Sequence, residues 1–223
     1  KIVISSGVVT TLAGPAAGYS WDGSTDGTGT AARFDYPFAI TRDGNYLYVA
    51  DRENHQIRRV HKSTGEVTTF AGSGTAGSAD DDTGTDATFY APEGITNDGT
   101  NLYVSGTQNQ NIRKIEISTG EVTTIAGSGS SGSADGRGTA VTFSAPEGIA
   151  TDGTNLYVSD TQNHTIRKIS SRGTVTADLT LHNLDDDTDV TVAVSSSDTG
   201  EATVDTAALT FTEDNWDTAQ TVT

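Results

Sequence analysis

The chain has 223 residues and a net charge of −17 at pH 7, with 30 acidic and 13 basic side chains. A surface this acidic repels phosphate backbones and disfavours nucleic-acid binding, and the lack of cysteine excludes disulfides and thiolate zinc sites. No apolar run is long enough for membrane insertion, and because methionine is absent we expect a processed form or a fragment of a longer protein.

Residues 9–173 contain the same sequence unit three times. Its prolines, Pro37, Pro92 and Pro146, lie 55 and 54 residues apart. Leu-Tyr-Val begins at residues 47, 102 and 156, Ile-Arg at residues 57, 112 and 166, and Val-Thr-Thr at residues 9, 67 and 122. Repeats of this period indicate an array of similar structural units that bury surface against their neighbours.

Each unit predicts four short strands. In the second unit they are expected at residues 93–96, 102–104, 112–115 and 122–125. Asp98-Gly99 favours the positive φ angles of a hairpin turn between the first two strands. Four antiparallel strands in ~55 residues describe one blade of a β-propeller, so the sequence predicts an all-β fold.

The repeated motifs resemble the NHL repeat family, whose pattern runs PxGI…DG…LYVAD…NHxIRKI. The resemblance covers about residues 8–173 and implies three four-stranded propeller blades. NHL propellers usually close with about six blades, so it also implies a partial or oligomer-completed propeller. Open blade faces and edges are prone to association, and we therefore expect the blades to form an interaction scaffold.

The middle repeat departs from this pattern at two positions, with Gly106 in place of Asp51 and Asp160, and Gln110 in place of His55 and His164. The resemblance implies that this Asp and this His mostly support blade turns. We therefore expect the middle blade to satisfy its turn groups in another way. The recurring Ile-Arg-Lys positions are expected to give a few basic spots on the blades.

The strands predicted at the two ends of the array do not show how the propeller is completed. The third unit has a candidate fourth strand of its own at residues 174–176, so the strand predicted at residues 8–12 is surplus. This strand belongs either to a preceding blade outside the chain or to a neighbouring molecule to which it is lent. The chain is accordingly either a fragment of a longer propeller or a self-assembling half-propeller.

Residues 178–223 differ in character from the repeats. All 13 basic residues lie earlier in the chain, and this asymmetry of charge indicates a domain boundary. Alternating apolar residues predict strands at residues 190–194, 208–211 and 220–223.

This segment resembles the Calx-β or cadherin-like β-sandwich repeats of large bacterial surface proteins. It is too short for a seven-stranded sandwich, so we expect it to be truncated or completed by a strand from elsewhere. The apolar N-terminal strand is a candidate donor of that strand. We therefore divide the chain into residues 1–7, 8–177 and 178–223.

Two acidic clusters are candidate calcium sites, since Ca²⁺ prefers several oxygen ligands on a flexible loop. The denser cluster consists of Asp185, Asp186, Asp187 and Asp189, and the other of Asp80, Asp81 and Asp82. Solvated acidic turns are the alternative in both places. The loops that match residues 80–82 in the other units lack the extra carboxylates, so a site there is not part of the repeat.

No catalytic constellation is evident in the sequence. His55 and His164 occupy one repeat position, no set of three zinc ligands is indicated, and G-x-S-x-G is absent. We therefore predict a non-enzymatic extracellular or cell-surface protein, bacterial or archaeal. Its blades would form a structural and adhesive scaffold that self-associates by strand exchange or contacts neighbouring domains. The alternative is a glycan-binding or lyase-type propeller whose site needs additional blades.

Overall fold

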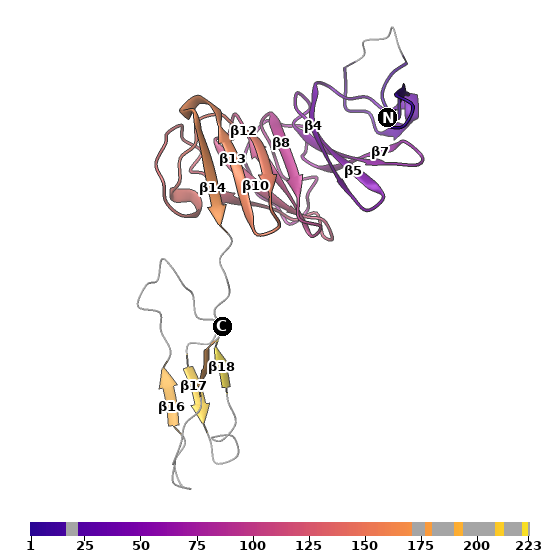
Figure 1. The fold of residues 1–223 in the computed structure, drawn as a ribbon. Helices are drawn as coiled ribbons and strands as arrows, with labels where there is room; N and C mark the ends of the chain where they lie inside the picture. Colours follow the sequence, from indigo (N-terminus) through magenta and orange to yellow (C-terminus); the bar gives the residue numbers. More distant parts are fainter. Residues whose placement is uncertain (17–21, 171–176, 180–189, 194–207, 212–219, 223) are drawn as a thin grey trace. The chain divides into compact units, whose positions relative to one another are not determined.

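The structure is a computed structural model that describes residues 1–16, 22–170, 177–179, 190–193, 208–211 and 220–222 (Figure 1). The chain divides into two compact units, Lys1–Ser170 and Ser171–Thr223. The first contains three antiparallel sheets that resemble propeller blades, and the predicted all-β class is confirmed.

The three sheets, called blades one, two and three below, repeat one strand order. Blade one comprises β3 (Gly27–Thr28), β4 (Pro37–Asp43), β5 (Tyr46–Asp51), β6 (Gln56–His61) and β7 (Glu66–Ala71), in the order β3-β7-β6-β5-β4. Blade two comprises β8 (Pro92–Asn97), β9 (Asn101–Gly106), β10 (Asn111–Glu116) and β11 (Val122–Ala126). Blade three comprises β12 (Pro146–Thr151), β13 (Asn155–Asp160) and β14 (Thr165–Ser170). The four strands predicted for the second unit are confirmed, whereas the candidate fourth strand at residues 174–176 lies outside the described residues.

The blades share their backbone irregularities as well as their strands. A bulge separates Ile57 from Arg58 in β6, and another separates Ile112 from Arg113 in β10. Non-glycine residues with positive φ recur at matching places: Tyr36, Ala91 and Ala145 before the first strand, and His55, Gln110 and His164 before the third. Since a positive φ is unfavourable for such residues, its recurrence shows that the repeat imposes one backbone path on each blade.

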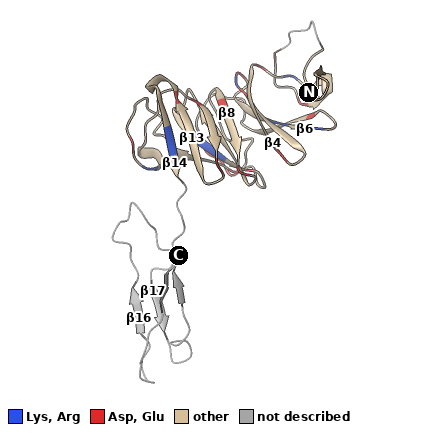
Figure 2. Cartoon of the chain, in the orientation of Figure 1, with Lys and Arg blue, Asp and Glu red and all other residues tan. Residues whose placement is uncertain are grey.

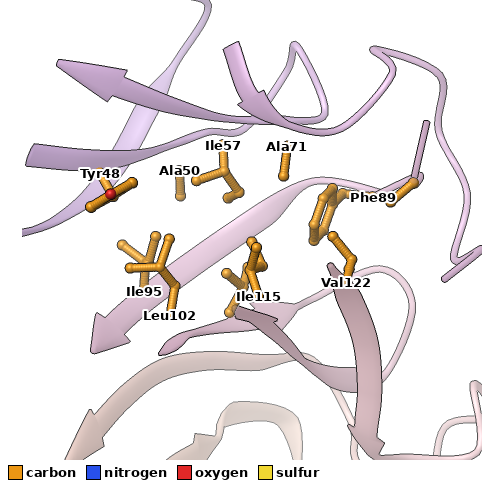
Figure 3. Close-up of a cluster of buried hydrophobic side chains, with 11 residues drawn as sticks. Tyr48, Ala50, Ile57, Ala71, Phe89, Ile95, Leu102, Ile115 and Val122 are labelled. Carbon is orange, nitrogen blue, oxygen red and sulfur yellow. The ribbon is translucent and has the colours of Figure 1, made fainter. Parts of the chain in front are cut away.

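The core lies between neighbouring blades. Between blades one and two, the side chains of Tyr48, Ala50 and Ile57 point toward those of Ile95, Leu102 and Ile115 (Figure 3). A second cluster between blades two and three contains Ile112, Ala126, Phe143, Leu156 and Val158. Because side chains alternate along a strand, Leu102 faces blade one, whereas Tyr103 next to it packs against the cluster shared with blade three.

The inner strands of adjacent blades approach closely. A Cβ at Gly94 in β8 would collide with the carbonyl oxygen of Glu147 in β12. Glycine is therefore required at residue 94, because the two backbones leave no room for a side chain.

The N-terminal residues form a small hairpin. In the surplus strand predicted at residues 8–12, only β2 (Val8–Val9) is a strand, and it pairs with β1 (Ile2–Val3) of the same chain. Further on, Leu12 and Ala13 pack against the buried Val49 of blade one. The role of residues 1–7 as a donor strand stays a prediction.

In the second unit the structure describes two strand pairs. β15 (Ala177–Leu179) pairs with β18 (Gln220–Val222), and β16 (Val190–Ala193) pairs with β17 (Ala208–Phe211). The strands predicted near residues 190, 208 and 220 are confirmed. The sandwich expected for residues 178–223 stays a prediction.

Helical structure in the described ranges is limited to three single 3-10 turns, η1 (Gly29–Ala31), η2 (Gly138–Ala140) and η3 (Thr161–Asn163). None of the helices in this part of the chain is long and apolar enough to cross a membrane.

Candidate functional site: buried arginines and open blade faces

Each blade is organised around one arginine of its third strand. In blade one, Arg58 donates to Asp51 Oδ2 at 2.8 Å and to Asp26 Oδ1 at 2.7 Å, and its side chain is fully buried. The guanidinium lies 5.3 Å from the ring centroid of Phe34. Blades two and three place Arg113 and Arg167 in the same setting, over Phe89 and Phe143. The expected basic spots are therefore wrong for Arg58 and Arg113, because the bulge before each residue turns its side chain into the blade.

The loop that precedes each blade supplies a carboxylate for this arginine. Asp80 accepts hydrogen bonds from Arg113 Nη2 at 2.7 Å and from the amide and hydroxyl of Thr124, both at 2.9 Å. Asp26 makes the same contacts with Arg58 and Thr69 in blade one. These contacts tie the loop to the third and fourth strands, a role that the sequence did not reveal.

Blades one and three add a second, fully buried carboxylate. Asp51 accepts the amide of Asp35 at 2.8 Å and Asn54 Nδ2 at 2.8 Å. Asp160 accepts the amide of Ser144 at 2.6 Å and Asn163 Nδ2 at 2.7 Å in the same way. Burial raises the pKa of Asp51, while the hydrogen bonds from Asn54, from the Asp35 amide and from Arg58 oppose that effect. The predicted turn support by this Asp is confirmed.

Blade two lacks this second carboxylate. A Cβ at Gly106 would lie 2.4 Å from Asn111 Oδ1, so the space of the aspartate is taken by the asparagine. Asn111 Oδ1 is buried and has no hydrogen-bond partner in the part of the chain that the structure describes. Arg113 keeps Asp80 and the carbonyl oxygens of Ala79 and Thr88, the latter two at 2.8 Å each, and Arg167 makes contacts of the same kind in blade three. The middle blade therefore lacks the buried aspartate, and the different support expected for its turn groups stays a prediction.

The histidine position links neighbouring blades as well as supporting a turn. The Ala91 amide of blade two donates to His55 Nδ1 of blade one at 3.2 Å. Gln110 Oε1 of blade two accepts the Ala145 amide of blade three at 2.7 Å. The glutamine thus preserves the bond between blades that the histidine makes. His164 stands at this position in blade three, where it is exposed.

Of the two candidate calcium clusters, the structure describes only Asp80, Asp81 and Asp82, and these carboxylates form no metal-binding group. The Asp80 carboxylate is bound by Arg113 and Thr124, and Asp81 Oδ1 accepts the amide of Thr83 at 2.8 Å. In the ranges that the structure describes, no group of three or more His, Asp or Glu side chains is placed to hold a metal ion. The other cluster, Asp185, Asp186, Asp187 and Asp189, lies outside those ranges. Calcium binding stays a prediction for both.

The Asp-Gly turns carry a hydrogen-bonded tyrosine. Tyr103 donates its hydroxyl to Asp98 Oδ2 at 2.8 Å, and Tyr157 donates to Asp152 Oδ2 at 2.9 Å. Burial and the neighbouring Asp98 carboxylate raise the pKa of Tyr103 to about 12. Burial alone would raise the pKa of Asp98, but hydrogen bonds from Asn101, Thr100 and Tyr103 outweigh it and lower that pKa.

Within the described residues of the first unit, apolar side chains are exposed on both outer blades. On blade one, Tyr36, Phe38 and Ile40 are 63%, 48% and 60% exposed. On blade three, Ile166 is 73% exposed, whereas Ile57 and Ile112 at the same repeat position are fully buried. Comparison of the repeats could have found the open blade-one face, because Tyr36 and Phe38 replace an alanine and a glutamate there.

The blades carry both basic and acidic residues. Basic residues appear on β14, and acidic residues are scattered over the three blades (Figure 2). The largest fully buried side chains are the arginines of blades one and two, which are paired. Within the described residues, the distinctive surfaces are therefore the open blade faces.

Comparisons with known proteins agree with the repeat architecture. Over 101 residues the chain is 41% identical to NHL repeat-containing protein 2 of Bos taurus, a match covering 44% of the chain and 14% of that protein. The human protein of the same name is 36% identical over 107 residues, covering 46% of the chain and 15% of its own length. The chain therefore spans only a small part of these relatives, and no protein-family model matches it.

Among solved structures, a putative phosphatase from Bacteroides thetaiotaomicron superimposes with a TM-score of 0.54 and 28% identity, covering 60% of this chain and 34% of that one. An auxiliary nutrient binding protein from the same organism gives a TM-score of 0.51 and 28% identity, covering 59% and 36%. The motifs, the common strand order and these likenesses lead to one conclusion. The three sheets of the first unit resemble the β-propeller blades of NHL repeat proteins.

Proposed function

We propose that this protein is a structural and adhesive module of an extracellular or cell-surface protein, in which the propeller blades form a scaffold for protein contacts, including self-association. The proposal assigns no catalytic reaction to the described blades. Their buried charges hold the blades together, and their open faces make the contacts.

The exposed apolar residues at the two ends of the blade array carry this proposal. Ile166 is 73% exposed, although the same position is fully buried in the other two blades. Ile40 is 60% exposed, whereas its counterpart Ile95 is 6% exposed. Exposed apolar faces of this kind are typical of protein interaction surfaces.

The surface charge is consistent with contacts between proteins and not with a nucleic acid. The chain carries a net charge of −17, and the arginines of blades one and two are buried. A nucleic-acid-binding blade would need these cations on its surface to neutralise phosphates.

The alternative is a ligand-binding propeller whose site needs additional blades. It is favoured by the 28% identity with the auxiliary nutrient binding protein of Bacteroides thetaiotaomicron. In this alternative the chain contributes one wall of a small-molecule site, a glycan site being the first candidate, and does not associate with itself.

Sedimentation velocity and electron microscopy of the full chain test the two alternatives together. The scaffold predicts concentration-dependent assemblies, and Ile166→Asp should shift them to the monomer without lowering the unfolding midpoint. Ile166→Val, which keeps the face apolar, serves as the matched control. A discrete monomer that binds a glycan saturably would contradict the scaffold and support the alternative.

A further inference from the structure

Residues 1–14 repeat the second half of a blade. Lys1–Gly7 reads Lys-Ile-Val-Ile-Ser-Ser-Gly, and residues 114–120 read Lys-Ile-Glu-Ile-Ser-Thr-Gly. The sequence continues as Val-Val-Thr-Thr-Leu-Ala-Gly in one case and Glu-Val-Thr-Thr-Ile-Ala-Gly in the other. The N-terminal residues therefore match the end of a third strand, its turn and a complete fourth strand.

The pairing of the N-terminal hairpin has the register of that blade half. Ile2 pairs with Val9, as Ile115 pairs with Val122 in blade two. The turn glycine has a positive φ in both hairpins, 67° at Gly7 and 83° at Gly120. A one-residue slip would exchange the two faces of the strands, so this agreement extends the repeat to the N-terminal residues.

The N-terminal segment also sits on blade one as a fourth strand sits on the next blade. The Gly14 amide donates to the Gly29 carbonyl at 3.0 Å, and the Gly72 amide donates to the Gly84 carbonyl at 2.9 Å. Leu12 and Ala13 pack on the cluster of blade one that contains Val60. Phe70 and Ala71 occupy the same place in the cluster that contains Ile115 of blade two. Blade one therefore already carries the outer half of a preceding blade.

The open part of blade one is the part that an inner blade half covers elsewhere. In blade two, Glu93 is bonded to Arg52, which follows β5, at 2.7 Å. Asn97 Nδ2 donates to Thr41 Oγ1 of β4 at 2.6 Å. The first two strands of a blade and the turn after them thus cover the next blade's first strand. Tyr36, Phe38 and Ile40 lie on the corresponding first strand and its approach in blade one, and they are exposed.

We propose that residues 1–14 are the outer half of a fourth NHL-type blade, and that Tyr36, Phe38 and Ile40 form the seat of its inner half. The occupant of this seat is a polypeptide segment of the same repeat, with two strands of the pattern Pro-x-Gly-Ile and Leu-Tyr-Val. The inference goes beyond the proposed function, because it assigns the blade-one face to the other half of a blade and leaves the face of blade three for other contacts.

The seat sets two requirements on its occupant. Phe38 replaces the Glu93 that binds Arg52, so the occupant needs an uncharged residue where blade one has Arg52. The Tyr36 amide stands where the Ala91 and Ala145 amides donate to His55 and Gln110. The occupant therefore presents a histidine or glutamine to accept this amide. Blades one and two do the same for the blade that follows each of them.

A surrogate for the missing half can be taken from this chain. Residues 73–113 end at the residue before Lys114, the counterpart of Lys1, so their fusion ahead of Lys1 rebuilds a whole blade in register. Thr107 stands at the Arg52 position in this surrogate, and Gln110 is available for the Tyr36 amide. The matched control has one glycine inserted between Arg113 and Lys1, which shifts the register by one residue.

Hydroxyl-radical footprinting of the full chain and of both fusions is the test. The in-register fusion should lower the reactivity of Tyr36, Phe38 and Ile40 on the order of fivefold or more, because burial removes solvent access. The shifted fusion should leave it unchanged. Equal reactivity in all three proteins would overturn the inference, and so would protection of these residues in the unfused chain on dimerisation, which would assign the seat to a second copy.

A variant of the unfused chain keeps the test decisive if a fusion does not fold. Leu12→Asp should raise the reactivity of Val49 and Val60, because residues 12–13 cover that cluster as a fourth strand does. Unchanged reactivity there would also overturn the inference. Sedimentation of the same samples tests the proposed function separately. The footprints of the fusions can be read whether or not the chain assembles.

Discussion

The middle blade and the two blades beside it have nearly the same repeat, but they differ in two respects. Blade two is covered on both faces, whereas blade three has an exposed Ile166 where blade two has a fully buried Ile112. Blade two also has Gly106 where blades one and three have a buried aspartate. The first difference comes from the neighbours of a blade and the second from its own sequence. Equal repeats therefore do not make equal contributions to stability.

The largest expected effect is a difference between blades one and two in the unfolding free energy lost when the buried arginine is replaced. Arg58→Ala should lower the free energy of unfolding by about 3–5 kcal/mol, because it leaves Asp51 as a buried carboxylate without its cation. Arg113→Ala should cost about 1–3 kcal/mol, since its carboxylate partner Asp80 is 44% exposed and can be hydrated. Urea unfolding measures both values. Equal costs would show that the buried aspartate does not distinguish the blades.

The next effect is a difference in unfolding free energy between the same substitution on a buried blade face and on an exposed one. Ile112→Ala should cost about 2–5 kcal/mol, because it leaves a cavity between blades two and three. Ile166→Ala should change the free energy of unfolding of the monomer by less than about 0.5 kcal/mol, because that side chain is 73% exposed. Urea unfolding at low protein concentration is the measurement. A large cost at residue 166 in the monomer would mean that another segment of the chain covers it.

A smaller effect tests the hydrogen bond between blades. Gln110→Ala removes the acceptor of the Ala145 amide and should cost about 1–2 kcal/mol. Gln110→His should recover most of that loss, because His55 accepts the Ala91 amide at the same repeat position. His164→Ala serves as the control and should leave stability unchanged within about 0.5 kcal/mol. If the histidine variant is as unstable as the alanine variant, the two acceptors are not interchangeable.

The smallest effect is a shift in the titration of one tyrosine. Tyr103 should ionise near its raised pKa of about 12, and Asp98→Asn should return its pKa toward about 10. Because the folded-state pKa is raised, the stabilisation by this group is complete below the unfolded pKa of about 10 and is lost as pH rises through about 12. Ultraviolet titration of the wild type, Asp98→Asn and Tyr103→Phe isolates the signal. A Tyr103 that titrates near pH 10 in the wild type would contradict the assignment.

The sequence was sufficient to predict the blades, because their signals are local. Asp98-Gly99 lies in a hairpin turn, and Leu-Tyr-Val alternates between the two faces of β9. The departure at Gly106 is visible in the sequence, whereas the position of Asn111 beside it is seen only in the structure.

The exposed position on blade three and the arginine networks could not be predicted in the same way. Arg58 follows a bulge and pairs with Asp26, which is 32 residues away in the chain, so neither its burial nor its partner is a local property. The exposure of Ile166 depends on what lies beside blade three and not on its own motif. Aligning residues 1–14 with residues 114–127 would have revealed the N-terminal half-blade from sequence, but the shared register is visible only in the strand pairs.

The exposed face of blade three should be a contact surface equivalent to the buried face of blade two. Hydroxyl-radical footprinting of the wild-type chain over a range of protein concentrations tests this equivalence. We expect Ile112 to be protected at every concentration, and Ile166 to be reactive at high dilution and to become protected as the chain associates. An Ile166 that stays reactive at all concentrations, or one that is protected even at high dilution, would contradict it.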